Sequence, residues 1–80
     1  MSNDTFFYID EIVGELRKLL PDAEVYSNMT RYDGKHCVVF VVEMDGKTFA
    51  NRHVVNKIDF QAYKKIPKHF YDNIIGCSYE

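Results

Sequence analysis

The chain has 80 residues, a formal net charge of −2 and a hydrophobic fraction of 46%, with six tyrosines and six phenylalanines. A chain of this length can enclose only one hydrophobic core, so we expect a single domain spanning residues 1–80. The apolar content excludes an intrinsically disordered segment, and the negative charge argues against general attraction to nucleic acid or anionic membranes.

The first predicted element is a helix from about Thr5 to Leu20. Apolar residues recur there at helical spacing and form one stripe, which is typical of a helix packed on a core. Pro21 and Asp22 end the helix, since proline cannot continue it. The stripe consists of Ile9, Ile12, Val13, Leu16, Leu19 and Leu20.

Two Asp-Gly pairs, at residues 33–34 and 45–46, flank a valine-rich run. Asp-Gly supplies the two positive-φ positions of a type I′ turn, which joins antiparallel strands with two residues. We therefore predict a three-stranded antiparallel meander whose register is set by the turns. The predicted strands cover residues 23–32, 35–44 and 47–55.

This register divides the sheet into two faces, because side chains alternate along a strand. One face is predicted to pack on the core and collects Val25, Met29, Val38, Phe40, Val42, Met44, Phe49 and Val55. The other face is polar and aromatic at its edges and has a small apolar centre. It collects Tyr26, Asn28, Thr30, Tyr32, Cys37, Val39, Val41, Glu43, Thr48, Ala50 and Arg52.

The last element is predicted as two short helices, Phe60–Lys65 and Pro67–Ile75, because Pro67 lacks the amide that a helix interior needs. We expect one buried side, made of Phe60, Tyr63, Ile66, Phe70 and Ile74. The fold class is therefore α+β, with the order α-β-β-β-α and the last helix broken near Pro67. Both helical elements are expected on one face of the sheet, since so short a chain cannot easily cover both.

The uncovered face is the predicted partner-binding surface. Tyrosine and arginine around a small apolar centre are typical of protein interfaces, including those of homodimers. The candidate residues are Tyr26, Asn28, Tyr32, Val39, Val41 and Arg52. An alternative is that the valines reflect β-propensity and the tyrosines shield them.

A basic segment provides the rival hypothesis. Residues 52–69 contain five basic residues and one acid, a local charge of +4, whereas residues 1–24 contain six acids and two bases, a local charge of −4. Nucleic-acid phosphates could bind the basic segment. Alternatively, the two segments complement each other within the molecule. The candidate phosphate-binding residues are Lys57, Lys64, Lys65 and Lys68.

The predicted α-β-β-β-α order and the His-x-x-x-Phe spacing of His36 and Phe40, just after Gly34, resemble the double-stranded RNA-binding domain. This resemblance implies RNA binding through basic residues near the last helix. In that family the helix opens with a Gly-rich turn and a Lys-Lys-x-x-Lys signature. Here residues 50–57 read Ala-Asn-Arg-His-Val-Val-Asn-Lys, and only Lys57 partly matches.

Residues that could carry chemistry do not form a known motif. His36 and His53 are predicted to lie diagonally on one sheet face, but no zinc-binding spacing accompanies them. Cys37 lies in mid-strand, away from any helix N-terminus or cationic pocket that would activate a thiol. Glu24 and Glu43 are predicted to face each other across two strands, which is typical of a solvated cross-strand pair. We therefore expect no enzyme, no cofactor and no metal.

We expect a small binding module that acts as an inhibitor, regulator or adaptor of a larger protein complex, through its sheet face or through either edge strand. Its size also fits a phage or mobile-element protein that blocks a host complex. Two cysteines in dissimilar contexts, Cys37 and Cys77, indicate a cytoplasmic protein without disulfides. No apolar stretch approaches the roughly 20 residues of a membrane helix, so we expect no membrane partner.

Overall fold

The structure, a computed structural model, describes the backbone of residues 4–78 and the side chains of residues 4–76. Its elements follow the predicted order. They are α1 (Asp4–Leu19), β1 (Glu24–Tyr32), β2 (Lys35–Met44), β3 (Lys47–Val54), the single-turn 3-10 helix η1 (Val55–Lys57) and α2 (Ala62–Ser78).

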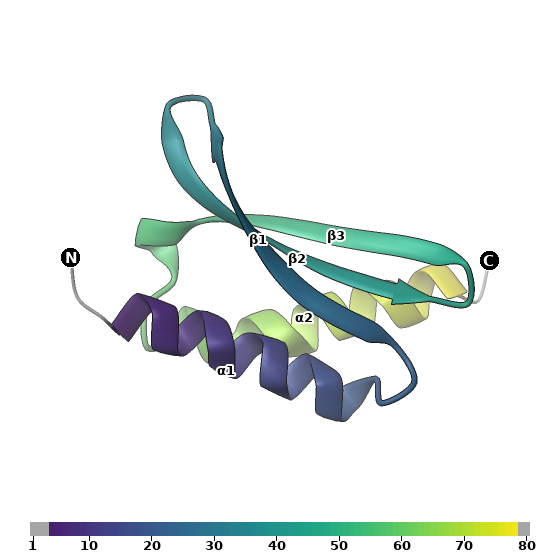
Figure 1. Ribbon diagram of the computed structural model, residues 1–80. Helices are drawn as coiled ribbons and strands as arrows, with labels where there is room; N and C mark the ends of the chain where they lie inside the picture. The colour runs from purple at the N-terminus through teal and green to yellow at the C-terminus, as the bar shows by residue number, and fades with distance from the viewer. Residues whose placement is uncertain (1–3, 79–80) are drawn as a thin grey trace.

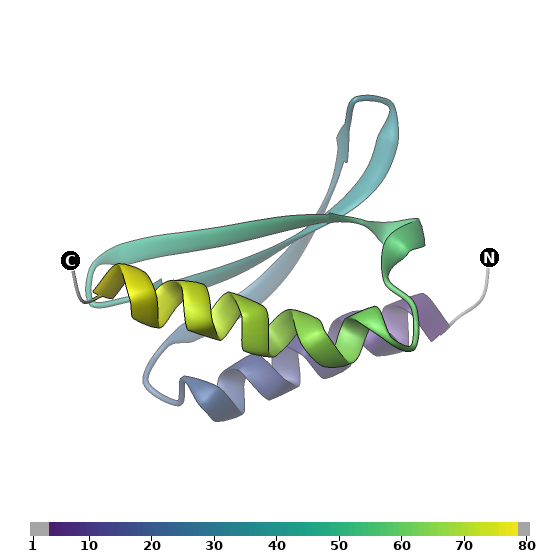
Figure 2. The ribbon, with the colours of Figure 1, turned by 180° about the vertical axis from the view of Figure 1, so that it is seen from behind.

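The elements form two layers (Figures 1 and 2). The sheet has the order β1-β2-β3, and both helices lie side by side beneath one face of it. The opposite face of the sheet has no helix over it in either view. The predicted α+β fold with the order α-β-β-β-α is confirmed.

Both hairpin turns have the backbone that Asp-Gly favours. Asp33 and Gly34 have φ values of 53° and 74°, and the second turn repeats them with 54° and 75°. Two consecutive positive φ values define the type I′ turn, whose twist matches that of the flanking strands. Tyr32 consequently pairs with Lys35, and the whole predicted register is confirmed.

The core lies between the helical layer and the sheet. Phe40 and Val42 of β2 are fully buried, as are Ile12 and Leu16 of α1. Burying one such side chain contributes roughly 1.5–3 kcal/mol, so this seam supplies much of the driving force for folding. The last turn of α1 departs from the predicted stripe, because Leu19 is 38% exposed while Leu20 takes the buried place.

The predicted break near Pro67 is wrong, because α2 is continuous from Ala62 to Ser78 and contains Pro67. Proline at this position removes one hydrogen bond, the one to the carbonyl of Tyr63 in the preceding turn. The rest of the helix keeps its bonds, and Pro67 itself is buried against its surroundings. Packing on α1 and the core therefore outweighs a local defect close to the start of the helix.

Two residues that were assigned to the core are exposed. Phe60 precedes α2 and is 58% exposed, because the helix begins only at Ala62, where Asp59 Oδ1 accepts a 2.8 Å hydrogen bond from the Ala62 amide. Met29 points to the helix side of the sheet but is 52% exposed. Figure 1 shows the reason, since the β1–β2 hairpin rises away from the helices toward its tip.

Candidate protein-binding surface

The outer sheet face, as we call the face opposite the helices, is built by the register of the three strands. Across the strands, Tyr26 pairs with Val41 and Val41 with Ala50. In the next row toward the β1–β2 turn, Asn28 pairs with Val39 and Val39 with Arg52. The outer sheet face thus brings together all six predicted partner-binding residues: Tyr26, Asn28, Tyr32, Val39, Val41 and Arg52.

The apolar centre of the outer sheet face is less exposed than predicted. Val41 is only 7% exposed and Cys37 only 2%, although both point away from the helices. No helix covers them, so their neighbours on the same face must shield them. Asn28, Tyr32 and Arg52 are exposed, and Tyr26 and Val39 are half-buried. The accessible part of the surface is therefore polar and aromatic.

Arg52 and Tyr32 are held together on this face. The guanidinium carbon of Arg52 lies 3.6 Å from the centre of the Tyr32 ring, the geometry of a cation–π contact. The two residues come from the two outer strands, and β2 lies between them. By the register, the line that joins them crosses β2 at the level of Cys37, whose burial this contact explains.

The two sheet edges differ in their freedom to accept another strand. On β1, the Arg17 side chain donates two hydrogen bonds, of 3.0 and 3.3 Å, to the outward carbonyl oxygen of Val25. On β3, the turn geometry directs the amides and carbonyls of Thr48, Ala50, Arg52 and Val54 away from β2. Arg17 thus hinders the addition of another strand at the start of β1, and the edge of β3 is more accessible to such a strand.

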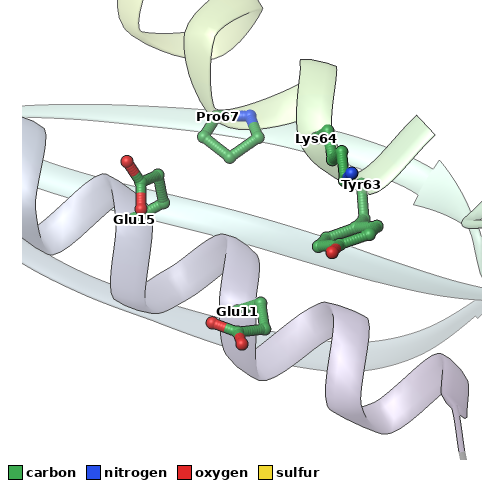
Figure 3. A pocket seen from close by; sticks show the side chains of 5 residues that line it. All are labelled: Glu11, Glu15, Tyr63, Lys64 and Pro67. Carbon is green, nitrogen blue, oxygen red and sulfur yellow. The ribbon is translucent and has the colours of Figure 1, made fainter. Parts of the chain in front are cut away.

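The basic segment is not a continuous phosphate-binding surface. Lys64 shares a polar cleft of about 300 Å³ with Glu11 and Glu15 of α1 (Figure 3), and Lys68 lines a neighbouring hollow with Glu15 and Asp72. These lysines therefore lie close to carboxylates of the same molecule, as expected if the basic segment and the acidic first helix complement each other in charge.

The start of α2 is also unfavourable for a phosphate. The Asp59 carboxylate accepts hydrogen bonds from the amides of Gln61 and Ala62, at 3.1 and 2.8 Å. Phosphates bind at helix starts through such free amides, and here a negative charge already occupies that place. Of the four predicted lysines, Lys57 lies apart in η1 and Lys65 is exposed on α2.

The two histidines predicted to share a sheet face do so, but in different surroundings. His36 is exposed, and its Nε2 accepts a 3.1 Å hydrogen bond from Arg31, whose guanidinium can only donate. His53 is half-buried beside Phe40, with ring centres 5.8 Å apart, and burial lowers the pKa of its imidazole. No cluster of three or more His, Cys, Asp or Glu residues suited to a metal occurs within residues 4–78.

The remaining candidates for chemistry lie apart from one another. Glu24 and Glu43 are direct cross-strand partners, as predicted. The Cys37 thiol donates a long 3.6 Å hydrogen bond to the carbonyl oxygen of Lys35 and is closed to solvent. The side chain of Cys77 lies outside the described residues. Among the side chains of residues 4–76, no nucleophile is paired with a base.

One end of the molecule carries apolar groups that the sequence did not reveal. Phe6 and Phe7 at the start of α1 are 50% and 55% exposed, and Met29 lines the same cavity as Phe6. Nearby, Tyr8 stacks on Tyr63 with ring centres 4.4 Å apart. Phe7 lies off the stripe of α1, and Phe6 lies at the N-terminal edge of the stripe, three residues before Ile9. Only the tertiary arrangement brings Phe6 together with Met29.

Comparison with protein families, with curated proteins and with solved structures finds no match to this chain. Within residues 4–78, neither helix is long and apolar enough to cross a membrane.

Proposed function

We propose that this chain is a small non-enzymatic protein-binding module that docks on its partner through the outer sheet face. The observation that carries the proposal is the pairing of exposed Arg52 with exposed Tyr32 on a face that the chain's own helices leave uncovered. Tyrosine and arginine dominate the binding energy of many interfaces, and fixing them before binding reduces the entropy lost on docking.

The shielded valines refine this proposal. Val41 acts as a support beneath Tyr26 and its neighbours, while Tyr26, Asn28, Tyr32 and Arg52 make the contacts. Substituting Val41 would therefore test folding rather than binding, since it would place a new group at a buried site. The partner is another protein or protein complex, and a second copy of the chain is the alternative. Strand addition at the β3 edge would extend the same contact.

We also propose that the module acts in the cytoplasm, as an inhibitor, regulator or adaptor. The support for this location is the sparse cysteine content and the free, buried thiol of Cys37. The support for a regulatory role is the uncovered outer sheet face, together with the lack of a paired nucleophile and base among the described side chains of residues 4–76. A phage protein that blocks a host complex would have the same properties.

The decisive experiment compares the partner protein captured by the immobilised wild-type chain with that captured by the Arg52→Glu and Tyr26→Ser variants. Lys18→Glu is the matched control, because it makes the same charge change on an exposed helix position. We expect both sheet variants to lose the bound protein and the control to keep it. Sedimentation of the purified chain distinguishes a homodimer, which the same two variants should dissociate. Unchanged capture and unchanged mass in both variants would refute docking through this face.

A salt titration separates this proposal from nucleic-acid binding. Phosphate contacts made by Lys57, Lys64, Lys65 and Lys68 would weaken steeply as salt rises, because binding releases counterions. Docking through tyrosines and a shielded apolar support should change little over the same range. A steep loss of binding with salt would favour the nucleic-acid hypothesis instead.

A further inference from the structure

The end of the molecule that carries Phe6 and Met29 contains a groove, which we call the hairpin groove. Its walls come from the start of α1, the β1–β2 hairpin and the segment around η1, which meet at one end of the molecule in Figure 1. The groove encloses about 650 Å³. This volume lies within the range of sites that bind ligands or peptide side chains. The residues that matter here are Phe6, Met29, Lys35, His36, Val55 and Lys57.

The groove is apolar inside, and two of its apolar side chains lie outside the hydrophobic core. Phe6 and Met29 are each about half exposed, at 50% and 52%, and neither belongs to the buried core. Val55, at the base of the groove, is part of that core. Single exposed apolar residues are common on proteins, but two that converge on one cavity form a surface suited to an apolar side chain.

The rim of the groove is basic, although the chain as a whole is negative. Lys35 and His36 border it from the hairpin, and Lys57 borders it from η1. Arg31 is joined to His36 by a 3.1 Å hydrogen bond, which brings a further positive charge to the same side. None of the residues that line the groove is acidic. A partner with carboxylates is therefore attracted and one with lysines is repelled.

We propose that the hairpin groove binds an acidic segment of another protein, in which one or two large apolar side chains are flanked by Asp or Glu. The apolar side chain would lie between Phe6 and Met29, above Val55. The flanking carboxylates would meet Lys35 and Lys57 on opposite sides. Met29 and His36 point to the helix side of the hairpin, whereas Lys35, the cross-strand partner of Tyr32, lies at the border with the outer sheet face. The groove therefore opens mainly on the helix side, and both sites can be occupied at the same time.

The groove favours a protein segment over the alternative classes of ligand. A nucleic acid would place phosphates on the rim, but its bases need planar rings for stacking. The lining holds two rings, Phe6 and His36, and His36 is already hydrogen-bonded to Arg31. A long lipid tail needs enclosure, whereas here the two main apolar walls are half exposed. A short apolar anchor between two charged rims suits an acidic peptide best.

The test selects binders from a random peptide library displayed against the wild-type chain. We expect the recovered peptides to be enriched in Asp and Glu next to Leu, Ile, Phe or Trp. The affinity of one such peptide is then measured through a tryptophan placed at its anchor, because the chain itself contains no tryptophan. Failure to recover peptides, or recovery without the acidic and apolar enrichment, would overturn the proposal.

Substitutions then locate the site. Met29→Glu and Lys57→Glu should each weaken the peptide about fivefold or more, since each places a carboxylate against the peptide's own charges. Thr30→Glu is the matched control, because Thr30 is exposed, adjoins Met29 and points to the opposite face. Circular dichroism shows whether each variant is folded. Equal weakening by Thr30→Glu, or displacement of the peptide by duplex RNA at low concentration, would contradict the assignment.

Failure here is distinguishable from failure of the outer sheet face. Arg52→Glu should leave the selected peptide bound, and Met29→Glu should leave capture through the outer face intact. A peptide that is lost with Arg52→Glu but retained with Met29→Glu would show that the hairpin groove is not its site.

Discussion

Arg52 reaches across the central strand of the sheet and places its guanidinium 3.6 Å from the ring centre of Tyr32. The contact spans the outer sheet face over Cys37, whose side chain is 2% exposed although it points away from the helices. A pair of surface side chains thus protects a thiol that the backbone alone would leave open. The contact also orders the two residues on which the proposed docking depends.

Removing this contact should expose the thiol of Cys37. We expect Arg52→Ala and Tyr32→Ala to accelerate its reaction with a disulfide reagent in the native state, with a loss of stability of only about 0.5–1 kcal/mol. The measurement uses a Cys77→Ser background, so that Cys37 supplies the whole signal. Lys47→Ala, an exposed position beside the other hairpin turn, is the control. If both variants react no faster than the control, other side chains must shield Cys37.

The pairing of Glu24 with Glu43 predicts a stabilising charge change. Like charges directly opposite each other on neighbouring strands repel, and such pairs are worth roughly 0.2–1 kcal/mol. Glu24→Lys replaces repulsion by attraction and should raise the free energy of unfolding by about 0.5 kcal/mol, measured by urea denaturation. The gain should shrink in high salt, because both positions are partly or fully exposed. A gain that is insensitive to salt would point to a cause other than charge.

The strand pattern was predictable because its determinants are local. Each Asp-Gly pair requires two positive φ values, and the turns so formed set every cross-strand pair by counting. The predicted break at Pro67 was wrong because the free-energy cost of proline in a helix is smaller than the stabilisation from packing the long helix on the core. Val41 and Met29 were misjudged for a different reason. Val41 is shielded by neighbouring side chains on the outer sheet face, and Met29 is exposed because the hairpin bends away from the helices. The alternation of side chains along a strand predicts only the face of each residue and neither of these effects.

The hairpin groove could not be predicted at all, because its walls come from three segments far apart in the sequence. Phe6 precedes the predicted stripe of its helix, and the alternation of the strand predicts Met29 in the core. Lys57 is predicted only as a candidate nucleic-acid-binding residue, apart from Phe6 and Met29. The outer sheet face, by contrast, follows from the register, so its residues were predicted together.

Two glycines in different backbone conformations should respond in opposite directions to alanine. Gly14 lies within α1, and a Cβ there would meet nothing within 4 Å, so Gly14→Ala should stabilise the chain by about 1 kcal/mol. Gly46 has a φ of +75°, which an L-residue adopts at a cost of roughly 1–2 kcal/mol, so Gly46→Ala should destabilise it. Thermal unfolding measures both. A stabilising Gly46→Ala would mean that the second turn is not type I′ in solution.

His53 should make the stability of the chain depend on pH. Burial lowers the pKa of this histidine, so the folded state holds its proton less tightly than the unfolded chain, in which histidine titrates near 6.5. As the pH falls below about 6.5, the unfolded chain takes up a proton that the folded state resists, and the free energy of unfolding decreases. Above that pH the imidazole is neutral in both states, and its contribution is constant.

The matched variant is His53→Leu, compared with wild type by urea denaturation between about pH 5.5 and 7.5, where the carboxylates remain ionised. The variant should lose most of the slope over this range. It should also be equally or more stable at the upper end, by up to about 1 kcal/mol, because the buried Nε2 of His53 lacks a hydrogen-bond partner among the described residues. His36→Leu, at an exposed position on the same face, is the control and should retain the slope. If the slope instead disappears with His36→Leu and survives His53→Leu, the exposed imidazole beside Arg31 governs the pH dependence.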